Sequence, residues 1–302
     1  MKLLNLLNKR IMEQKKTKLT KYLTFLMVTV FLGSCTDKQF VENLNDGTLV
    51  ANQSNEFLSL IEQAKWGDGQ ACLKLADCYR DGKGVKKDFL NMLNMVDMAK
   101  QYGGIRNMDD YIKMMPEDSE FRLFFDAVDL YENGKVEEAM LKTEQLMTQG
   151  SPDEYSVKGI FAVENGDTLE GKRLMETASA LGSSFAELVL CIPDWQGDNN
   201  PDVEKMKGLA DRIPLASQLL ADLYTGRFKE DMKDEKLAAY YYLKADEMAC
   251  LGKQGARWLM YYHQNVSPLP LSEKDVQRLQ ILTGANEEPI ENIEVTDTVV
   301  VE

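Results

Sequence analysis

The residues best suited to nucleophilic chemistry are His263 and Ser267. His263 is the single histidine of the 302-residue chain, so a histidine-activated serine would have to use it. Ser267 follows four residues later, but one helical turn does not make a catalytic triad, and nothing in the sequence marks an oxyanion hole. The sequence therefore predicts a structural histidine and no nucleophilic catalysis.

Other kinds of chemistry leave no stronger signal. The stretches "GDGQ" (67–70) and "GKG" (82–84) belong to a helical repeat rather than to a phosphate-binding loop. Paired acids such as Asp109–Asp110 are numerous because the chain is acidic, and they indicate a solvated face. A lone histidine without a nearby cysteine does not indicate a metal site. We therefore expect no cofactor, no metal and no enzymatic activity.

An aromatic-rich region is the candidate binding surface. "YYYLKAD" (240–246) places three tyrosines in a row, which at about 100° per residue cannot all be buried on one helix. "RWLMYYH" (257–263) follows it. We take Tyr240, Arg257, Trp258 and Tyr261 as candidate binding residues, because Tyr, Trp and Arg dominate interaction hot spots. The alternative is a core of stacked aromatic rings with solvent-reaching hydroxyls.

The elements that would position these residues follow from an internal repeat. "ACLKLADCYRDG" (71–82) returns 145 residues later as "ASQLLADLYTG" (216–226), which is four periods of about 36 residues. Ala71, Leu75, Ala76 and Tyr79 share one helical face. Gly82 can adopt the left-handed conformation that ends a helix. After the turn, "GVKKD" (84–88) places Asp88 near the start of the next helix, where negative charge is favourable. The repeat therefore predicts antiparallel helix pairs.

A glycine is expected to close the second helix of each pair. These glycines are Gly103, Gly150, Gly182, Gly252 and Gly284, and Pro214 is expected to end the segment that lacks one. Weaker copies of the repeat at 125–134 and 159–166 fall between the two clear ones. The region 120–214 is therefore equally well described as tetratricopeptide-like helix pairs.

The units at 64–103 and 216–252 resemble the Sel1-like repeat, a relative of the tetratricopeptide repeat. The second unit departs from the family pattern, because "RFKEDMK" (227–233) replaces its second glycine and valine. The resemblance implies an all-α solenoid of antiparallel helix pairs, about five or six of them, with an extended concave surface. It also implies an adaptor that gathers other proteins. Two alternatives stay open: a glycan- or peptidoglycan-contacting protein that uses the aromatic residues, and a hydrolase.

The N-terminus predicts export and lipidation. Lysines precede the apolar run "YLTFLMVTVFL" (22–32), which is too short to span a bilayer. "LGSC" (32–35) resembles the bacterial lipoprotein cleavage box, with Cys35 as the residue that carries the lipid. We expect a protein of the bacterial cell envelope, anchored by lipid at Cys35, on the outer membrane, with another envelope protein as its partner.

The expected domains are a signal peptide (1–34), a flexible tether (35–53), a helical repeat domain (54–284) and an acidic disordered tail (285–302). Within the repeat domain, 103–120 is expected to be an insertion with one short helix, and 193–202 a long loop. Residues 1–34 hold seven of the 35 Lys/Arg and one of the 49 Asp/Glu, which leaves a net charge of −20. Such a charge disfavours nucleic acid and direct contact with anionic lipid.

Four cysteines remain after Cys35, and each lies among apolar or small residues. Cys72 and Cys78 are six residues apart on a predicted helix, so they point about 240° apart and cannot pair there. We expect all four, Cys72, Cys78, Cys191 and Cys250, to be small core residues, with one long-range disulfide as the alternative.

Overall fold

The structure, a computed structural model, describes residues 55–191, 201–226 and 230–283. Its helices, in chain order, are α3 (Asn55–Lys65), α4 (Gly69–Asp81), α5 (Phe89–Gln101), α6 (Met108–Met114), α7 (Glu120–Glu132), α8 (Val136–Thr148), α9 (Asp153–Glu164), α10 (Thr168–Ala180), α11 (Ser184–Val189), α12 (Val203–Leu209), α13 (Pro214–Tyr224), α14 (Glu235–Glu247), α15 (Gly252–Asn265) and α16 (Glu273–Thr283), with a 3-10 turn, η2 (Glu230–Met232). The signal peptide, the tether, Gly284, the acidic tail and most of the 193–202 loop lie outside the described residues.

Consecutive helices pack as pairs, which confirms the all-α prediction. The pairs are α4 with α5, α7 with α8, α9 with α10, α13 with α14, and α15 with α16. The predicted insertion contains one short helix, α6. No described helix is long and apolar enough to cross a membrane.

The first repeat unit shows the predicted local chemistry. Gly82 ends α4 in the left-handed region, with φ 74°, and its N–H donates to the carbonyl of Cys78. Asp88 begins α5 by accepting a hydrogen bond from the N–H of Asn91. The N–H of Asp88 also donates to the carbonyl of Tyr79 at 3.0 Å, so the end of one helix is tied to the start of its partner.

The second clear unit repeats this arrangement. Asp234 begins α14 by accepting from the N–H of Leu237, and its own N–H donates to the carbonyl of Tyr224 at 2.9 Å. Tyr224 is fully buried, and its counterpart Tyr79 is 2% exposed. The sequence repeat is therefore also a repeat of backbone hydrogen bonds.

Two predicted helix ends are wrong. Gly252 does not close α14 directly; the chain first enters the left-handed region at Ala249, with φ 58°, and does so again at Gly252, with φ 66°, where α15 begins. Helix α14 stops at Glu247, five residues before Gly252, so the chain turns before it reaches this glycine. Pro214 does not end a helix but begins α13, where its missing N–H costs no helical hydrogen bond.

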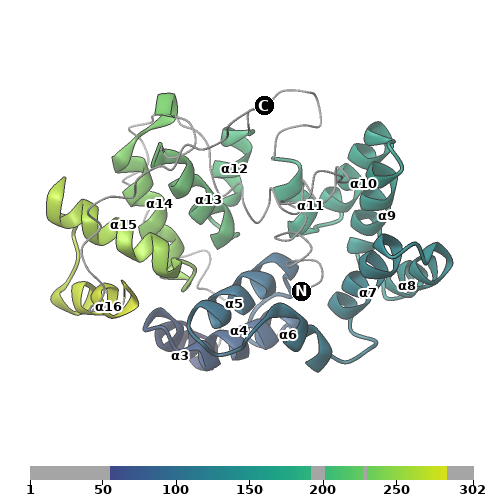
Figure 1. Cartoon of the computed structure of the whole chain (residues 1–302), viewed down its shortest axis with the longest axis horizontal. Coiled ribbons are helices and arrows are strands. Elements are labelled where there is room, and N and C mark those ends of the chain that lie inside the picture. The colour runs from purple at the N-terminus through teal and green to yellow at the C-terminus, as the bar shows by residue number, and fades with distance from the viewer. Residues whose placement is uncertain (1–54, 192–200, 227–229, 284–302) are drawn as a thin grey trace, which may run out of the picture.

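The solenoid curves until its last helix meets its first. Figure 1 shows the helices following one another around a ring, with α16 beside α3. Arg278 of α16 donates to the carbonyl of Lys65 at the end of α3, and Leu282 packs against Gly67. Helix α5 also contacts α11, α13 and α15 across the ring. The expected extended concave surface is therefore not left open, because the two ends pack on each other and α5 packs against later helices.

The cysteines and the histidine are structural. All four described cysteines are free, and three of them are buried to 1% exposure or less, with Cys78 half-buried. The disulfide alternative is therefore wrong. His263 accepts a hydrogen bond at Nδ1 from the N–H of Leu269 at 2.9 Å, which fixes the turn after α15.

Candidate functional site

A pocket of about 800 Å³ opens beside the first repeat turn. Its walls come from the turn between α4 and α5, from α5 itself, and from the segments that begin α7, α9, α11 and α13. Elements more than 100 residues apart in sequence therefore share this one site. We take this pocket as the candidate binding site.

An aromatic cluster holds these helix starts together. Phe89, in the first turn of α5, lies 5.1 Å from Phe121 and 4.5 Å from Phe124 of α7, measured between ring centroids. Phe185 of α11 lies 5.8 Å from Phe89 and 5.3 Å from Phe124. Because these rings are buried, they fix the beginnings of α5, α7 and α11 side by side under the pocket.

Asp88 links the repeat turn to the pocket. Its carboxylate accepts from the N–H of Asn91 at 2.8 Å and from the hydroxyl of Ser184, at the start of α11. Burial raises the pKa of Asp88, while these hydrogen bonds act in the opposite direction. The residue that the sequence assigns to helix capping therefore also lines the pocket.

Asp153 is the most deeply buried acid of the pocket, at 5% exposure. Its Oδ1 accepts from the hydroxyls of Ser183 at 2.5 Å and Ser156 at 3.0 Å. Burial raises the pKa of Asp153 to about 6, although the two hydroxyls favour the ionised form. Glu120 and Asp88 raise this pKa further through their negative charge, so three carboxyl groups lie near one another.

Glu120 completes this acidic group from α7. Its carboxylate accepts from the hydroxyl of Ser151 at 2.5 Å, and the same hydroxyl accepts from the N–H of Asp153 at 3.2 Å. Glu120 and Asp153 are therefore joined through one serine.

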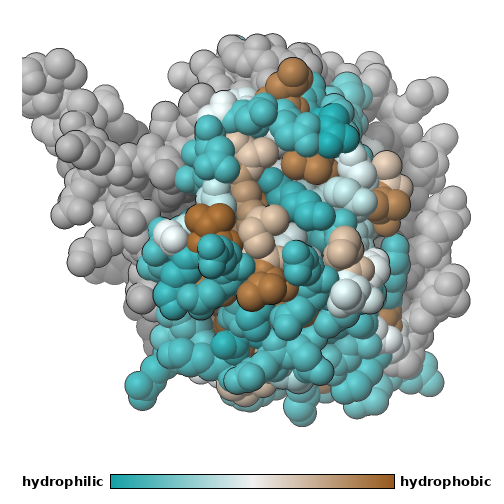
Figure 2. Space-filling model, turned by 90° about the vertical axis from the view of Figure 1, so that its right-hand side faces the viewer, coloured by the Kyte–Doolittle hydropathy of each residue, from teal (hydrophilic) through white to brown (hydrophobic). Residues whose placement is uncertain are grey.

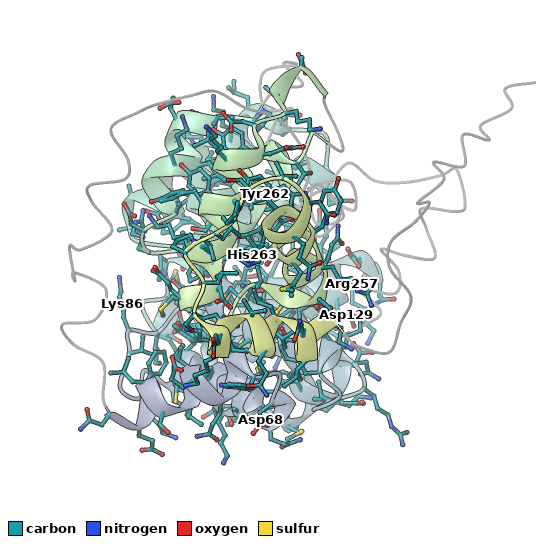
Figure 3. All side chains as sticks on the ribbon, turned by 90° about the vertical axis from the view of Figure 1, so that its left-hand side faces the viewer. Asp68, Lys86, Asp129, Arg257, Tyr262 and His263 are labelled. Atoms are coloured by element: carbon teal, nitrogen blue, oxygen red, sulfur yellow. The ribbon has the colours of Figure 1, made fainter. Side chains whose placement is uncertain are left out.

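Cations stand on the rim. Lys87 Nζ lies 4.0 Å from Glu120, and its side chain is 55% exposed. Lys86 is exposed and projects away from the ribbon in Figure 3. Arg212 pairs with Glu187 through two bonds of 2.5 and 2.8 Å. The described lining contains no histidine and no cysteine.

The four sequence-predicted residues do not line this pocket. Trp258 is half-buried and stacks on Tyr262, with centroids 5.2 Å apart. Tyr240 is half-buried against Tyr241 at 4.9 Å. Arg257 donates to the carbonyl of Thr283, at the end of α16.

Tyr261 is the exposed member of the four, at 50%. Tyr241 and Tyr242 are both buried, so the run of three tyrosines is mostly core. Figure 3 places Arg257 and His263 on different sides of α15. Of the two interpretations, the stacked aromatic core describes Tyr241, Tyr242, Trp258 and Tyr262.

The side of the ring that holds α7 to α10 presents exposed apolar side chains. In Figure 2 they form separate brown patches among hydrophilic residues. They include Val136, Leu141, Met147 and Leu169. Isolated apolar side chains are normal on a protein surface, so this face is a weaker candidate than the pocket.

The acids and serines of the pocket were missed by sequence reasoning, although a signal existed. "GSPD" (150–153) and "GSSF" (182–185) both place serine directly after a glycine that closes a helix. Gly150 and Gly182 follow helix ends, as predicted, and adopt positive φ. The serines after them bond to the pocket acids Glu120 and Asp153. A search for polar residues after each closing glycine would have found Ser151 and Ser183.

No family model matches the chain, and no curated protein matches it. Among solved structures, a Sel1 repeat protein from Oxalobacter formigenes is similar, with 15% identity, a TM-score of 0.36, and coverage of 77% of this chain and 99% of that one. The fold is established by the helix pairs themselves rather than by this match. The chain is an all-α solenoid of antiparallel helix pairs.

Proposed function

We propose that this chain is a non-catalytic adaptor of the bacterial cell envelope that binds a segment of another envelope protein in the pocket. The observation that carries the proposal is the pocket itself, because its polar walls come from helix starts along the whole first half of the ring and from α13. Helical repeats present such surfaces to protein partners. An opening of about 800 Å³ accommodates several side chains of a partner segment.

The pocket's chemistry supports binding rather than turnover. Ser183 donates to Asp153 and accepts from the N–H of Ala186, so its hydroxyl is held as the cap of α11. The histidine of the chain is engaged with the turn after α15. The glycan alternative has weaker support, because among its four aromatic and arginine residues Tyr261 is the exposed one.

Pocket-blocking substitution tests the adaptor function. Lys87→Trp adds a large ring at the exposed rim, whereas Lys113→Trp makes the same change at an exposed position of α6 outside the pocket. Both variants should keep the wild-type melting temperature. In pull-downs from crosslinked membranes, we expect Lys87→Trp to lose a partner that the wild type and Lys113→Trp retain. Capture of the same proteins by all three would show that the pocket is not used.

The anchor is proposed from the sequence, since Cys35 lies outside the described residues. Cys35→Ser should remove the site of lipid attachment, so the protein should move from the membrane fraction to the soluble fraction. It should also lose labelling by a palmitate analogue. Two or three acyl chains hold a protein stably, whereas the acidic body would be repelled by anionic lipid. Unchanged membrane partitioning of the variant would refute lipid anchoring.

A further inference from the structure

The pocket contains a buried hydrogen-bond acceptor that the protein leaves without a partner. Asn91, in the first turn of α5, lines the pocket at 5% exposure, and its Oδ1 has no hydrogen-bond partner among the described residues. A buried acceptor of this kind costs free energy unless a donor reaches it. Its position in the pocket wall points to a donor supplied by whatever occupies the pocket.

The charges around Asn91 indicate what kind of donor fits. The Asn91 N–H donates to Asp88, and Asp88 lies close enough to Asp153 to raise that residue's pKa. In the described part of the chain, neither Asp88 nor Asp153 forms an ion pair; hydroxyls and backbone N–H groups hold both. Glu120 is the pocket acid for which the described residues show an ion pair, the 4.0 Å contact with Lys87.

The rim does not supply the missing cation. Arg212 is committed to Glu187 through two short bonds and acts on Asp88 only through its charge, as the exposed Lys86 does. Lys87 reaches Glu120 only at the limit of an ion pair. The interior therefore carries three carboxyl groups and an unpaired amide oxygen. The lining cations Lys86, Lys87 and Arg212 lie at the rim, so the interior itself suits a bound cation with several N–H donors.

We propose that the pocket binds an arginine side chain of the partner protein, with the guanidinium donating to Asn91 Oδ1 and pairing with Asp88 and Asp153. This inference rests on the proposed adaptor function. A guanidinium carries five N–H donors in a rigid fork, so one group can serve acceptors that come from different helices. Apolar lining residues such as Val85 and Phe121 can cover the methylene stem of the arginine.

The probe is acetyl-Gly-Arg-Gly-amide, compared with the same peptide carrying citrulline, which has nearly the same shape but no charge. Binding is measured by NMR titration of the full chain, made soluble by replacing Cys35 with serine. The test variant is Asp88→Asn with Asp153→Asn. Asparagine caps helices as well as aspartate does, so α5 should keep its start.

The matched control is Asp202→Asn with Asp234→Asn. Both residues cap helices outside the pocket, and the change in net charge is the same. This control separates local pairing from the general attraction between a cationic peptide and an acidic protein.

We expect the wild type and the control variant to bind the arginine peptide about tenfold or more tightly than the citrulline peptide, the range for charge-assisted hydrogen bonds. The Asp88→Asn, Asp153→Asn variant should lose this preference. Equal binding of the two peptides, no binding at millimolar concentration, a preference that survives in the test variant, or tighter binding of sulfate at the same residues would each overturn the inference. If Lys87→Trp loses a partner but the peptide test fails, the adaptor function stands and only the arginine inference is overturned. The failure of the inference can therefore be distinguished from the failure of the proposed function.

Discussion

Arg278→Ala should destabilise the protein by about 3–5 kcal/mol, the cost of breaking a buried ion pair from one side. Arg278 is 3% exposed and Asp246 is 7% exposed. Two bonds of 2.8 and 2.5 Å join the guanidinium of α16 to the carboxylate of α14. Removing the arginine leaves Asp246 buried without its partner and also breaks the contact between Arg278 and the carbonyl of Lys65, which closes the ring.

Urea denaturation measures this loss, and a second bidentate pair provides the control. Arg173 holds Glu170 with bonds of 2.7 and 2.6 Å on the surface of α10. Because that pair is solvated, Arg173→Ala should change stability little. Replacing both Arg278 and Asp246 with apolar residues should cost less than Arg278→Ala alone, since no buried charge is left over. Equal and small effects of Arg278→Ala and Arg173→Ala would contradict the buried closure of the ring.

Asp153→Asn should make the protein more stable at neutral pH, by up to about 3 kcal/mol. The pKa of this carboxyl is raised from 3.8 to about 6 by burial. A carboxyl whose pKa is higher in the folded state holds its proton more tightly when folded. Its contribution therefore favours folding below pH ~4 and is lost as the pH rises from about 4 to about 6. Asparagine keeps the oxygen that accepts from Ser183 and Ser156 but cannot ionise.

The difference between wild type and Asp153→Asn isolates this group from the other acids. The gain in unfolding free energy should be largest at pH 7 and should shrink as the pH falls towards 4, where Asp153 is protonated. Denaturant midpoints measured at several pH values, with unchanged slopes, give this curve. A variant that is less stable than wild type at pH 7, or a difference that does not vary with pH, would refute the assignment of a buried, proton-binding Asp153.

The local features of the repeat could be predicted because their signals are local. Gly82 and Asp88 lie within seven residues of each other, and helix ends are set by the chemistry of the residues that form them. Tyr79 and Tyr224 could be recognised as equivalent by their neighbours, and both are buried. The same logic explains the error at Gly252: the pattern locates a glycine, but the helix before it stops earlier than the pattern implies.

The ring and the pocket could not be predicted in the same way. Arg278 and Lys65 are 213 residues apart, and no repeat pattern states that the last helix meets the first. Asp153 and Ser183 are 30 residues apart, so their contact depends on how neighbouring pairs stack. The aromatic and arginine residues near the C-terminus were chosen as candidate binding residues by their type. Residue type does not distinguish an aromatic side chain in the core from one on the surface.

The central claim is that a partner protein enters the pocket, and photocrosslinking from its rim tests this most directly. Leu181 lines the pocket and is 58% exposed, whereas Leu169, on the same helix pair, is 82% exposed and lies outside the pocket lining. A photoreactive phenylalanine derivative is placed at one position or the other in the lipid-anchored protein in living cells. The account predicts a discrete covalent adduct with one polypeptide from position 181 and none from position 169. Adducts from position 169 alone, or from neither position, would contradict it.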